Sequence, residues 1–223
     1  MNTIQSLLQQ GSNIAIIGEA ASGKSTLLKS ILNNLNFNNK KVLILDNKKE
    51  YKQSTLDLDG SYITYDDINN VRYNNKLTTI SFSIEDDRPG IELILSLIKK
   101  AENEGVEVIL IDEAHNYLKE CQKLISNVNA QLILSSQFDP CILGGECALN
   151  KENVINFKNL FNILILMGTH NYNIQTWPKL LSLYNIDKLT IEELKSQQCY
   201  KNIVIQDKKI IEENFKVPNT MKF

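Results

Sequence analysis

The sequence predicts an α/β fold with a mainly parallel central sheet. Apolar runs at residues 13–17, 41–46 and 106–113 are continuous rather than alternating. A continuous run is typical of a strand buried on both faces, as in a parallel sheet that helices cover. The first run leads through a glycine-rich loop into a helix-like segment at 27–35, which is the strand–loop–helix order of a phosphate-binding unit.

Further predicted elements alternate between strands and helices. The other strands cover 61–65, 77–84, 130–134, 161–167 and 200–206. The other helices cover 3–10, 87–104, 114–127 and 152–158, with a short one at the capping box 190–193. Pro89 suits the first turn of its helix, where a missing N–H does no harm, and Gly105 ends that helix.

Length and composition indicate one globular domain. The chain has 223 residues, 43% hydrophobic and 22% charged, which can bury a substantial core. We expect a single domain over 1–223, with a polar tail over 210–223, because Pro218 argues against a central strand there. No run approaches the roughly 18 apolar residues of a membrane span, and no leader peptide is recognisable. Four cysteines without regular spacing are expected to be reduced thiols, which favours the cytoplasm.

A phosphate-binding motif, Gly-x-x-x-x-Gly-Lys-Ser, occupies residues 18–25. Its backbone N–H groups would surround the phosphates of a nucleoside triphosphate, and its glycines let the loop turn tightly. Lys24 supplies a positive charge for the β- and γ-phosphates, and the Ser25 hydroxyl is a ligand for Mg²⁺. The helix that follows directs its positive end at the same phosphates. The predicted nucleotide-binding residues are Gly18, Ala21, Ser22, Gly23, Lys24, Ser25 and Thr26.

Two acids and an amide are the candidates for hydrolysis. Asp112 and Glu113 end the apolar strand at 106–113, where a carboxylate can lie beside the Mg²⁺ of a bound nucleotide. Asp112 would hold the ion, and Glu113 would orient and polarise the attacking water. Gln137 follows the next strand, where its amide could hydrogen-bond both the γ-phosphate and that water.

Arginine is scarce, so any role that requires an arginine has few candidate residues. It occurs only at Arg72 and Arg88, and the net charge is −2, so no overall basic field indicates nucleic acid. An arginine finger from a neighbouring subunit raises the hydrolysis rate by about 10³-fold or more. Arg88 is the preferred candidate for that role, because a helix start would fix its position.

Four motifs occur in a fixed order along the chain. They are the loop at 18–26, the strand end Asp46-Asn47-Lys48-Lys49-Glu50-Tyr51, the segment 109–115, and the strand end at 132–137. This order resembles the HerA/FtsK superfamily of P-loop DNA-pumping ATPases. The resemblance implies a RecA-like three-layer core, ATP and Mg²⁺ as cofactors, a homo-oligomeric ring with sites between subunits, and double-stranded DNA in its centre. The Asp-x-Lys-x-Glu-Tyr element is what separates this superfamily from other P-loop proteins.

The size of the chain is similar to that of compact viral genome-packaging ATPases or of mobile-element, conjugation-like motors. A capsid portal or a membrane complex would then be the docking partner, and a viral motor would lie in the host cytoplasm and in the virion. Lys48, Lys49 and Lys52 are candidate DNA contacts, although a run of lysines is more often a solvated face. Two alternatives stay open: a secretion or pilus-type ATPase, and a nucleotide-switched assembly factor that does not translocate DNA.

Overall fold

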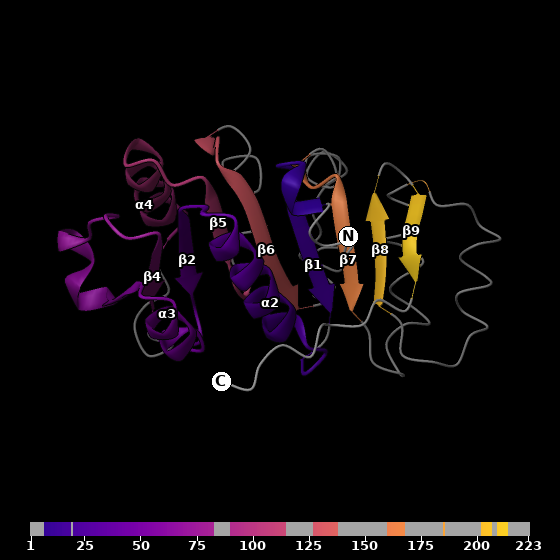
Figure 1. The fold of residues 1–223 in the computed structure, drawn as a ribbon, viewed down its shortest axis with the longest axis horizontal. Coiled ribbons are helices and arrows are strands. Elements are labelled where there is room, and N and C mark those ends of the chain that lie inside the picture. Colours follow the sequence, from indigo (N-terminus) through magenta and orange to yellow (C-terminus); the bar gives the residue numbers. More distant parts are fainter. Residues whose placement is uncertain are drawn as a thin grey trace.

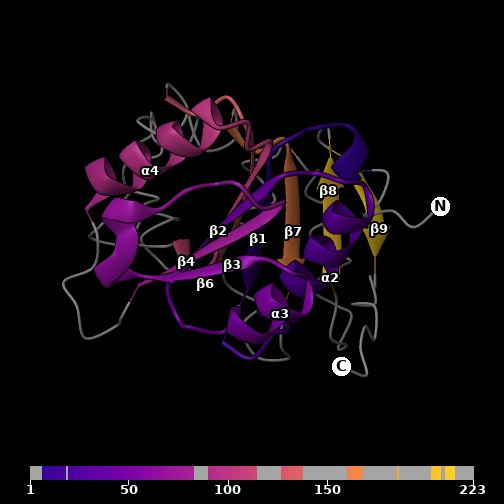
Figure 2. The same cartoon turned by 60° about the vertical axis from the view of Figure 1, so that its left-hand side comes forward.

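A computed structural model describes residues 7–18, 20–82, 90–114, 127–137, 160–167, 185, 202–206 and 209–213. In this part of the chain, one central sheet separates helices on its two faces (Figure 1, Figure 2). The sheet has nine strands: β1 Ile14–Gly18, β2 Val42–Asp46, β3 Ser61–Thr64, β4 Leu77–Ser81, β5 Val108–Ile111, β6 Gln131–Gln137, β7 Ile163–Met167, β8 Asn202–Gln206 and β9 Lys209–Glu213.

The sheet is mainly parallel, which confirms the predicted fold class. Its strand order is β3-β4-β2-β5-β6-β1-β7-β8-β9. The first seven strands in this order are parallel to their neighbours, whereas β8 and β9 are antiparallel. Strand β6 therefore lies between β1 and β5, although it follows both in the sequence.

Three α-helices and a 3₁₀ helix are described: α2 Lys24–Phe37, α3 Lys52–Asp57, α4 Ile91–Asn103 and η1 Tyr65–Asn70. Helices α2 and α4 match the predictions for 27–35 and 87–104, and Gly105 has the positive φ that ends a helix. Sequence reasoning missed α3, which has only six residues and lies in the polar stretch after β2. The predicted helix at 152–158, the capping box at 190–193 and nearly all of the helix at 114–127 lie outside the described residues. Of the helix predicted at 3–10, residues 3–6 also lie outside them, and residues 7–9 are helical.

The core has two halves because side chains of a strand point alternately to opposite faces. Ile14 and Ile16 of β1 pack into one cluster with α2, whereas Ala15 and Ile17 pack into the other with α4. Figure 2 shows α4 on one face of the sheet and α2 with α3 on the other. The central strands are covered on both faces, which is why they consist of continuous apolar runs.

One sequence prediction fails at the carboxyl-terminal end of the described chain. Residues 210–213 belong to β9, whereas the sequence indicated a polar tail from residue 210. An antiparallel edge strand needs only one buried face, so polar residues at alternate positions do not exclude it. In β9, Ile210 packs against the core and Ile211 is 43% exposed.

Gly18 is required by a close approach of β7 and not by an unusual φ angle. A Cβ atom at this position would lie 2.3 Å from the carbonyl oxygen of Met167 and 2.6 Å from the Ser22 hydroxyl. The first neighbour is backbone in a strand paired with β1, so it cannot turn away. Gly23, by contrast, has φ +90°, a conformation that favours glycine.

We expect Gly18→Ala to lower the free energy of unfolding by about 1–3 kcal/mol, because the added methyl group displaces either the phosphate loop or β7. Gly90→Ala is the matched control, since a Cβ there meets nothing within 4 Å. Urea denaturation of both variants measures the difference. Equal stability of the two variants would show that the loop relaxes without cost.

Candidate functional site

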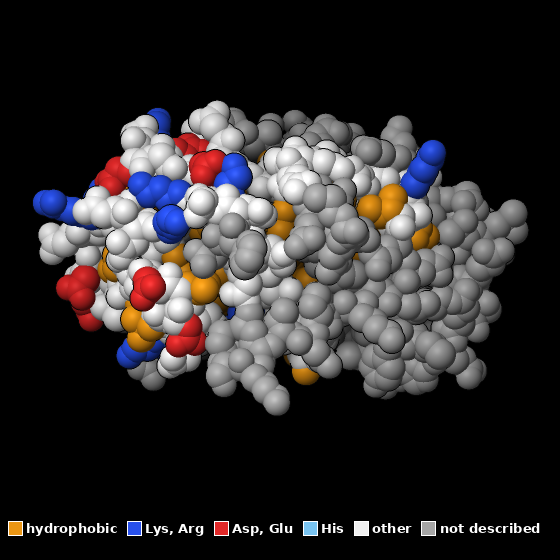
Figure 3. Space-filling view, viewed as in Figure 1, with side chains coloured by type: hydrophobic (Ala, Val, Ile, Leu, Met, Phe, Trp, Pro, Cys, Tyr) orange, Lys and Arg blue, Asp and Glu red, His pale blue; other side chains and the backbone are white. Residues whose placement is uncertain are grey.

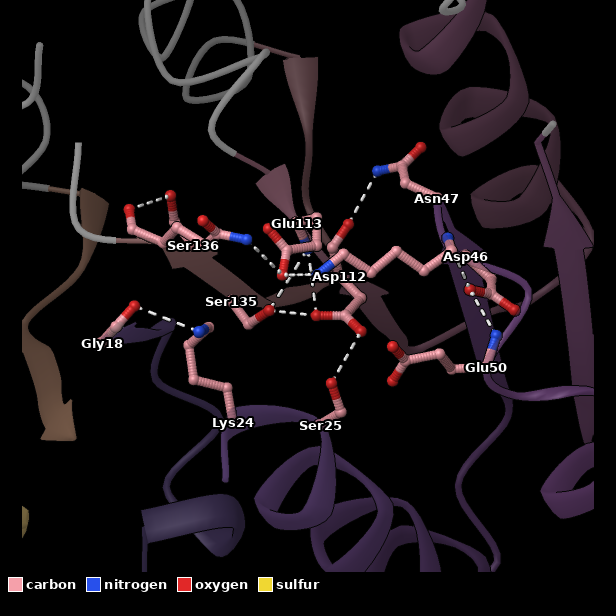
Figure 4. A network of polar contacts seen from close by, with 12 residues as sticks. Gly18, Lys24, Ser25, Asp46, Asn47, Glu50, Asp112, Glu113, Ser135 and Ser136 are labelled. Atoms are coloured by element: carbon pink, nitrogen blue, oxygen red, sulfur yellow. Dashed lines mark hydrogen bonds and ion pairs between the residues drawn. The ribbon is translucent and has the colours of Figure 1, made fainter. Parts of the chain in front are cut away.

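The predicted site residues converge at one edge of the sheet. Strands β2, β5, β6 and β1 are adjacent and parallel, so their carboxyl ends meet there. The phosphate loop follows β1, the Asp46 loop follows β2, Asp112 and Glu113 follow β5, and Gln137 is the last residue of β6. Figure 4 shows Ser25, Asp112 and Ser135 directed toward one another.

The phosphate loop wraps around the start of α2. The Lys24 ammonium group donates to the carbonyl oxygen of Gly18 at 3.1 Å, and Lys24 is only 5% exposed. Ala21 has φ +60° and Gly23 has φ +90°. Left-handed residues within a tight loop turn successive N–H groups toward a common centre, which favours an anion. A pocket of about 300 Å³ is lined by Ala20, Ala21, Ser22, Gly23, Lys24, Ser25, Thr26, Lys48, Glu50 and Glu113.

Asp112 is buried and hydrogen-bonded on both carboxylate oxygens. Its Oδ2 accepts from the Ser25 hydroxyl at 3.4 Å, and its Oδ1 accepts from the backbone N–H of Glu113 at 3.0 Å. The hydroxyl of Ser135, on β6, also donates to Oδ1. Burial raises the pKa of Asp112 above its ordinary value, although the hydrogen bond from Ser135 acts in the opposite direction.

Glu113 lies beside Asp112 and is contacted by two other loops. Its Oε1 accepts from the Lys48 ammonium group at 2.5 Å and from the Gln137 amide at 3.4 Å. Burial lowers the pKa of Lys48, but the hydrogen bond and the charge of Glu113 outweigh it and raise that pKa. Lys48 therefore lies in this site, whereas Lys49 and Lys52, the other candidate DNA contacts, are exposed.

Asp46 organises the loop that carries Lys48. Its carboxylate accepts the backbone N–H groups of Lys48 at 3.1 Å, Glu50 at 3.2 Å and Tyr51 at 3.0 Å. The Asn47 amide reaches across and donates to the carbonyl oxygen of Asp112 at 2.7 Å. Burial raises the pKa of Asp46, and the three backbone hydrogen bonds partly offset this. The Asp of the Asp-x-Lys-x-Glu-Tyr element thus shapes the loop, while its Lys enters the site.

Backbone strain is concentrated in the same three loops. Six described residues other than glycine have positive φ. Asn39, Asp59 and Asn185 are of types that tolerate this conformation. The other three are Ala21, Lys49 and Glu113, one in each loop of the site. Strained residues of this kind persist where the surrounding contacts over-determine the backbone, and they cluster at functional sites.

Comparison with known proteins identifies the family. The family model of the central domain of helicase HerA matches residues 11–209. The chain belongs to the HerA central-domain family. It is a P-loop ATPase of the HerA/FtsK kind with a RecA-like core. No curated protein matches its sequence.

Two solved structures share the fold of this chain. The genome packaging NTPase B204 from Sulfolobus turreted icosahedral virus 2, in complex with AMPPCP, is 20% identical and has a TM-score of 0.64, with 92% of this chain and 97% of that chain covered. VirB4 of Thermoanaerobacter pseudethanolicus is 13% identical and has a TM-score of 0.61, with 89% and 87% covered. At such low identity these likenesses show the fold alone.

The oxygen atoms of the HerA-family site suit Mg²⁺. This ion prefers hard oxygen ligands, keeps several waters and is usually held by one or two carboxylates together with substrate phosphates. The Ser25 hydroxyl and the Asp112 carboxylate, 3.4 Å apart next to the phosphate loop, offer hard oxygen atoms of this kind. Among the described residues, no group of three or more His, Cys, Asp or Glu side chains could hold a metal by itself. The donor set therefore fits an ion that arrives with a nucleotide.

The structure brings together nearly all predicted site residues but leaves the arginine prediction untested. Arg88 lies outside the described residues, and Arg72 is exposed. Sequence reasoning missed Ser135, which contacts Asp112, and the role of Lys48 at Glu113. Both residues stand in motifs that the sequence displayed, but nothing local indicates which distant side chain each would contact.

A larger pocket, of about 800 Å³, lies at the opposite edge of the sheet, at the amino ends of β1, β2, β5 and β6. Its charged lining is already paired: Glu107 with Lys40, and Glu102 with the backbone N–H groups of Asn129 and Ala130. It shares no residue with the phosphate loop. In the described part of the chain no helix is both long and apolar enough to span a membrane.

We expect Asp46→Asn to lower the free energy of unfolding by about 1–3 kcal/mol, because an amide NH₂ would face backbone N–H groups that now donate to a carboxylate. Asp57→Asn is the control: Asp57 is exposed and accepts only from Gln53, so its loss should cost less than about 0.5 kcal/mol. Denaturant titration measures both. An unchanged midpoint for Asp46→Asn would contradict the organising role of Asp46.

Proposed function

We propose that this chain is a Mg²⁺-dependent ATPase that drives the translocation of double-stranded DNA, as a compact viral genome-packaging motor or a mobile-element motor. The observation that carries the hydrolytic part is the pair of acids over the phosphate loop. Asp112 contacts Ser25, and Glu113 lines the same pocket as Lys24. This is the placement that metal binding and water activation require.

Each side chain has a distinct task in the proposed hydrolysis. Lys24 and the loop N–H groups hold the phosphates, while Ser25 and Asp112 hold the ion, which would neutralise charge developing on the phosphate oxygens. Glu113 accepts a proton from the attacking water, and Gln137 keeps that water in place. Lys48, which contacts Oε1 of Glu113 and lines the same pocket, would also face the γ-phosphate there.

We expect Glu113→Gln to bind ATP but to hydrolyse it at least about 10²-fold more slowly, because an amide cannot accept the proton of water. Lys24→Ala should instead lose nucleotide binding, because it removes the charge that faces the phosphates. Fluorescence titration with an ATP analogue separates binding from turnover. Near-normal hydrolysis by Glu113→Gln would remove Glu113 from its proposed role.

Support for the DNA-translocating part comes from family membership and from fold. B204, which covers 92% of this chain, is described as a genome packaging NTPase. By analogy, we propose a homo-oligomeric ring around double-stranded DNA, docked on a capsid portal or a membrane complex, with Arg88 completing the site of a neighbouring subunit. The face drawn in Figure 3 mixes lysines with acids in its described part. This suits DNA contact by a few lysines of a pore better than contact by a broad basic surface.

We expect linear double-stranded DNA to raise the ATPase rate of the wild-type chain several-fold, and a non-hydrolysable ATP analogue to shift its mass to that of a ring. The Glu113→Gln variant should form the same ring without turnover. ATPase assays beside light-scattering mass measurements test both points. A DNA-independent rate with a monomeric mass would favour the alternative of a nucleotide-switched assembly factor, and a DNA-independent ring would favour a secretion-type ATPase.

A further inference from the structure

Tyr51, the last residue of the Asp-x-Lys-x-Glu-Tyr element, is held rigidly beneath the site. Its backbone N–H donates to Asp46 at 3.0 Å, and its carbonyl oxygen accepts from the Thr55 N–H at 2.9 Å and the Thr55 hydroxyl at 2.7 Å. Its side chain is fully buried in the core cluster that contains Leu27 and Leu28 of α2. The backbone hydrogen bonds and the buried packing of the side chain therefore fix the position of the ring.

The hydroxyl of Tyr51 lies beside the Asp112 carboxylate. Burial and the negative charge of Asp112 together raise the pKa of Tyr51 well above its ordinary value. The contact with Asp112 contributes to that shift, but it is not a well-formed hydrogen bond, and the hydroxyl makes no well-formed hydrogen bond with any other described residue. A buried hydroxyl without a partner is unfavourable, and most tyrosine hydroxyls inside proteins have one. Tyr73, equally buried, shows the usual arrangement: its hydroxyl donates to the carbonyl oxygen of Leu97 at 3.1 Å.

Asp112 can accept from this hydroxyl, because a carboxylate oxygen takes more than one hydrogen bond, but a carboxylate cannot donate to the phenol oxygen. Ser25 donates to Oδ2, while Ser135 and the Glu113 N–H donate to Oδ1. A magnesium ion bound at Asp112 would bring waters with it, and water on a metal ion is a strong hydrogen-bond donor. A phenol can accept such a hydrogen bond and donate its own proton to a carboxylate.

We propose that the Tyr51 hydroxyl is a positioning group of the magnesium site: it accepts a hydrogen bond from a water on the ion and donates to Asp112. The orphaned hydroxyl, fixed beside the one buried carboxylate that faces Ser25, is the observation that assigns this role. The proposal rests on the proposed magnesium-dependent function. It adds Tyr51 to the groups that control metal affinity, at a position that never touches the nucleotide.

The test is Tyr51→Phe, which removes one oxygen atom and keeps the buried ring. Binding of a fluorescent non-hydrolysable ATP analogue is titrated with Mg²⁺ and repeated in EDTA. We expect unchanged affinity in EDTA, and a rise of about tenfold in the Mg²⁺ concentration at which binding is half-maximally tightened. The melting temperature of the nucleotide-free variant should equal or exceed that of the wild type, because no hydrogen bond within the described chain is lost.

Tyr73→Phe is the matched control. It removes a hydroxyl that has a partner, so we expect its melting temperature to fall by about 2–4 °C and its Mg²⁺ midpoint to stay at the wild-type value. Tyr51→Phe should therefore change the Mg²⁺ midpoint without lowering the melting temperature, and Tyr73→Phe should lower the melting temperature without changing the Mg²⁺ midpoint.

Three results would overturn the proposal for Tyr51. An unchanged Mg²⁺ midpoint in Tyr51→Phe would show that the hydroxyl does not act on the ion. An equal loss of affinity with Mg²⁺ and in EDTA, or a lowered melting temperature, would show a structural role instead. If wild-type binding itself does not depend on Mg²⁺, the magnesium part of the proposed function fails as well, which distinguishes that failure from one confined to Tyr51.

Discussion

The buried carboxylate of Asp112 ties together the loops on which the site depends. Removing a carboxylate from water is costly, so it is tolerated inside a protein only when hydrogen bonds replace its hydration. The donors here come from three places: the Ser25 hydroxyl at the start of α2, the Ser135 hydroxyl on β6, and the N–H of Glu113 after β5. Moving any of these segments would leave the charge poorly satisfied. The contacts that satisfy Asp112 therefore also fix the carboxyl edge of the sheet.

A second buried carboxylate, Asp46, has a different structural role from Asp112. Asp46 bonds only backbone N–H groups of its own loop, whereas Asp112 bonds side chains that a nucleotide and its ion would contact. Burial raises the pKa of both groups, but their partners differ. Asp46 shapes the loop from which Lys48 contacts Glu113, and Asp112 links the start of α2 to β6 through Ser25 and Ser135. The strained φ angles of Lys49 and Glu113 show how closely the two loops are constrained.

The fold by itself does not show which process ATP hydrolysis drives. A viral genome packaging NTPase and VirB4 share the same core with this chain at TM-scores of 0.64 and 0.61. Folds host many functions, so the argument for hydrolysis has to come from Asp112, Glu113 and their neighbours. A link to DNA depends on the oligomeric mass of the protein and on the response of its ATPase rate to DNA.

The sequence by itself determined the α/β class, the phosphate loop and the acidic pair, because each is written in contiguous residues. The glycine spacing and the Lys-Ser pair indicate a phosphate-binding loop, and the continuous apolar runs indicate buried strands. Only the tertiary structure decided that β6 lies between β1 and β5, which sets Gln137 opposite Gly18 and Ser135 against Asp112. It also decided that Lys48 contacts Glu113, 65 positions further along the chain, and that residues 209–213 form an edge strand. Strand order and such distant contacts follow from how helices and strands pack together, and no local pattern of residues encodes that.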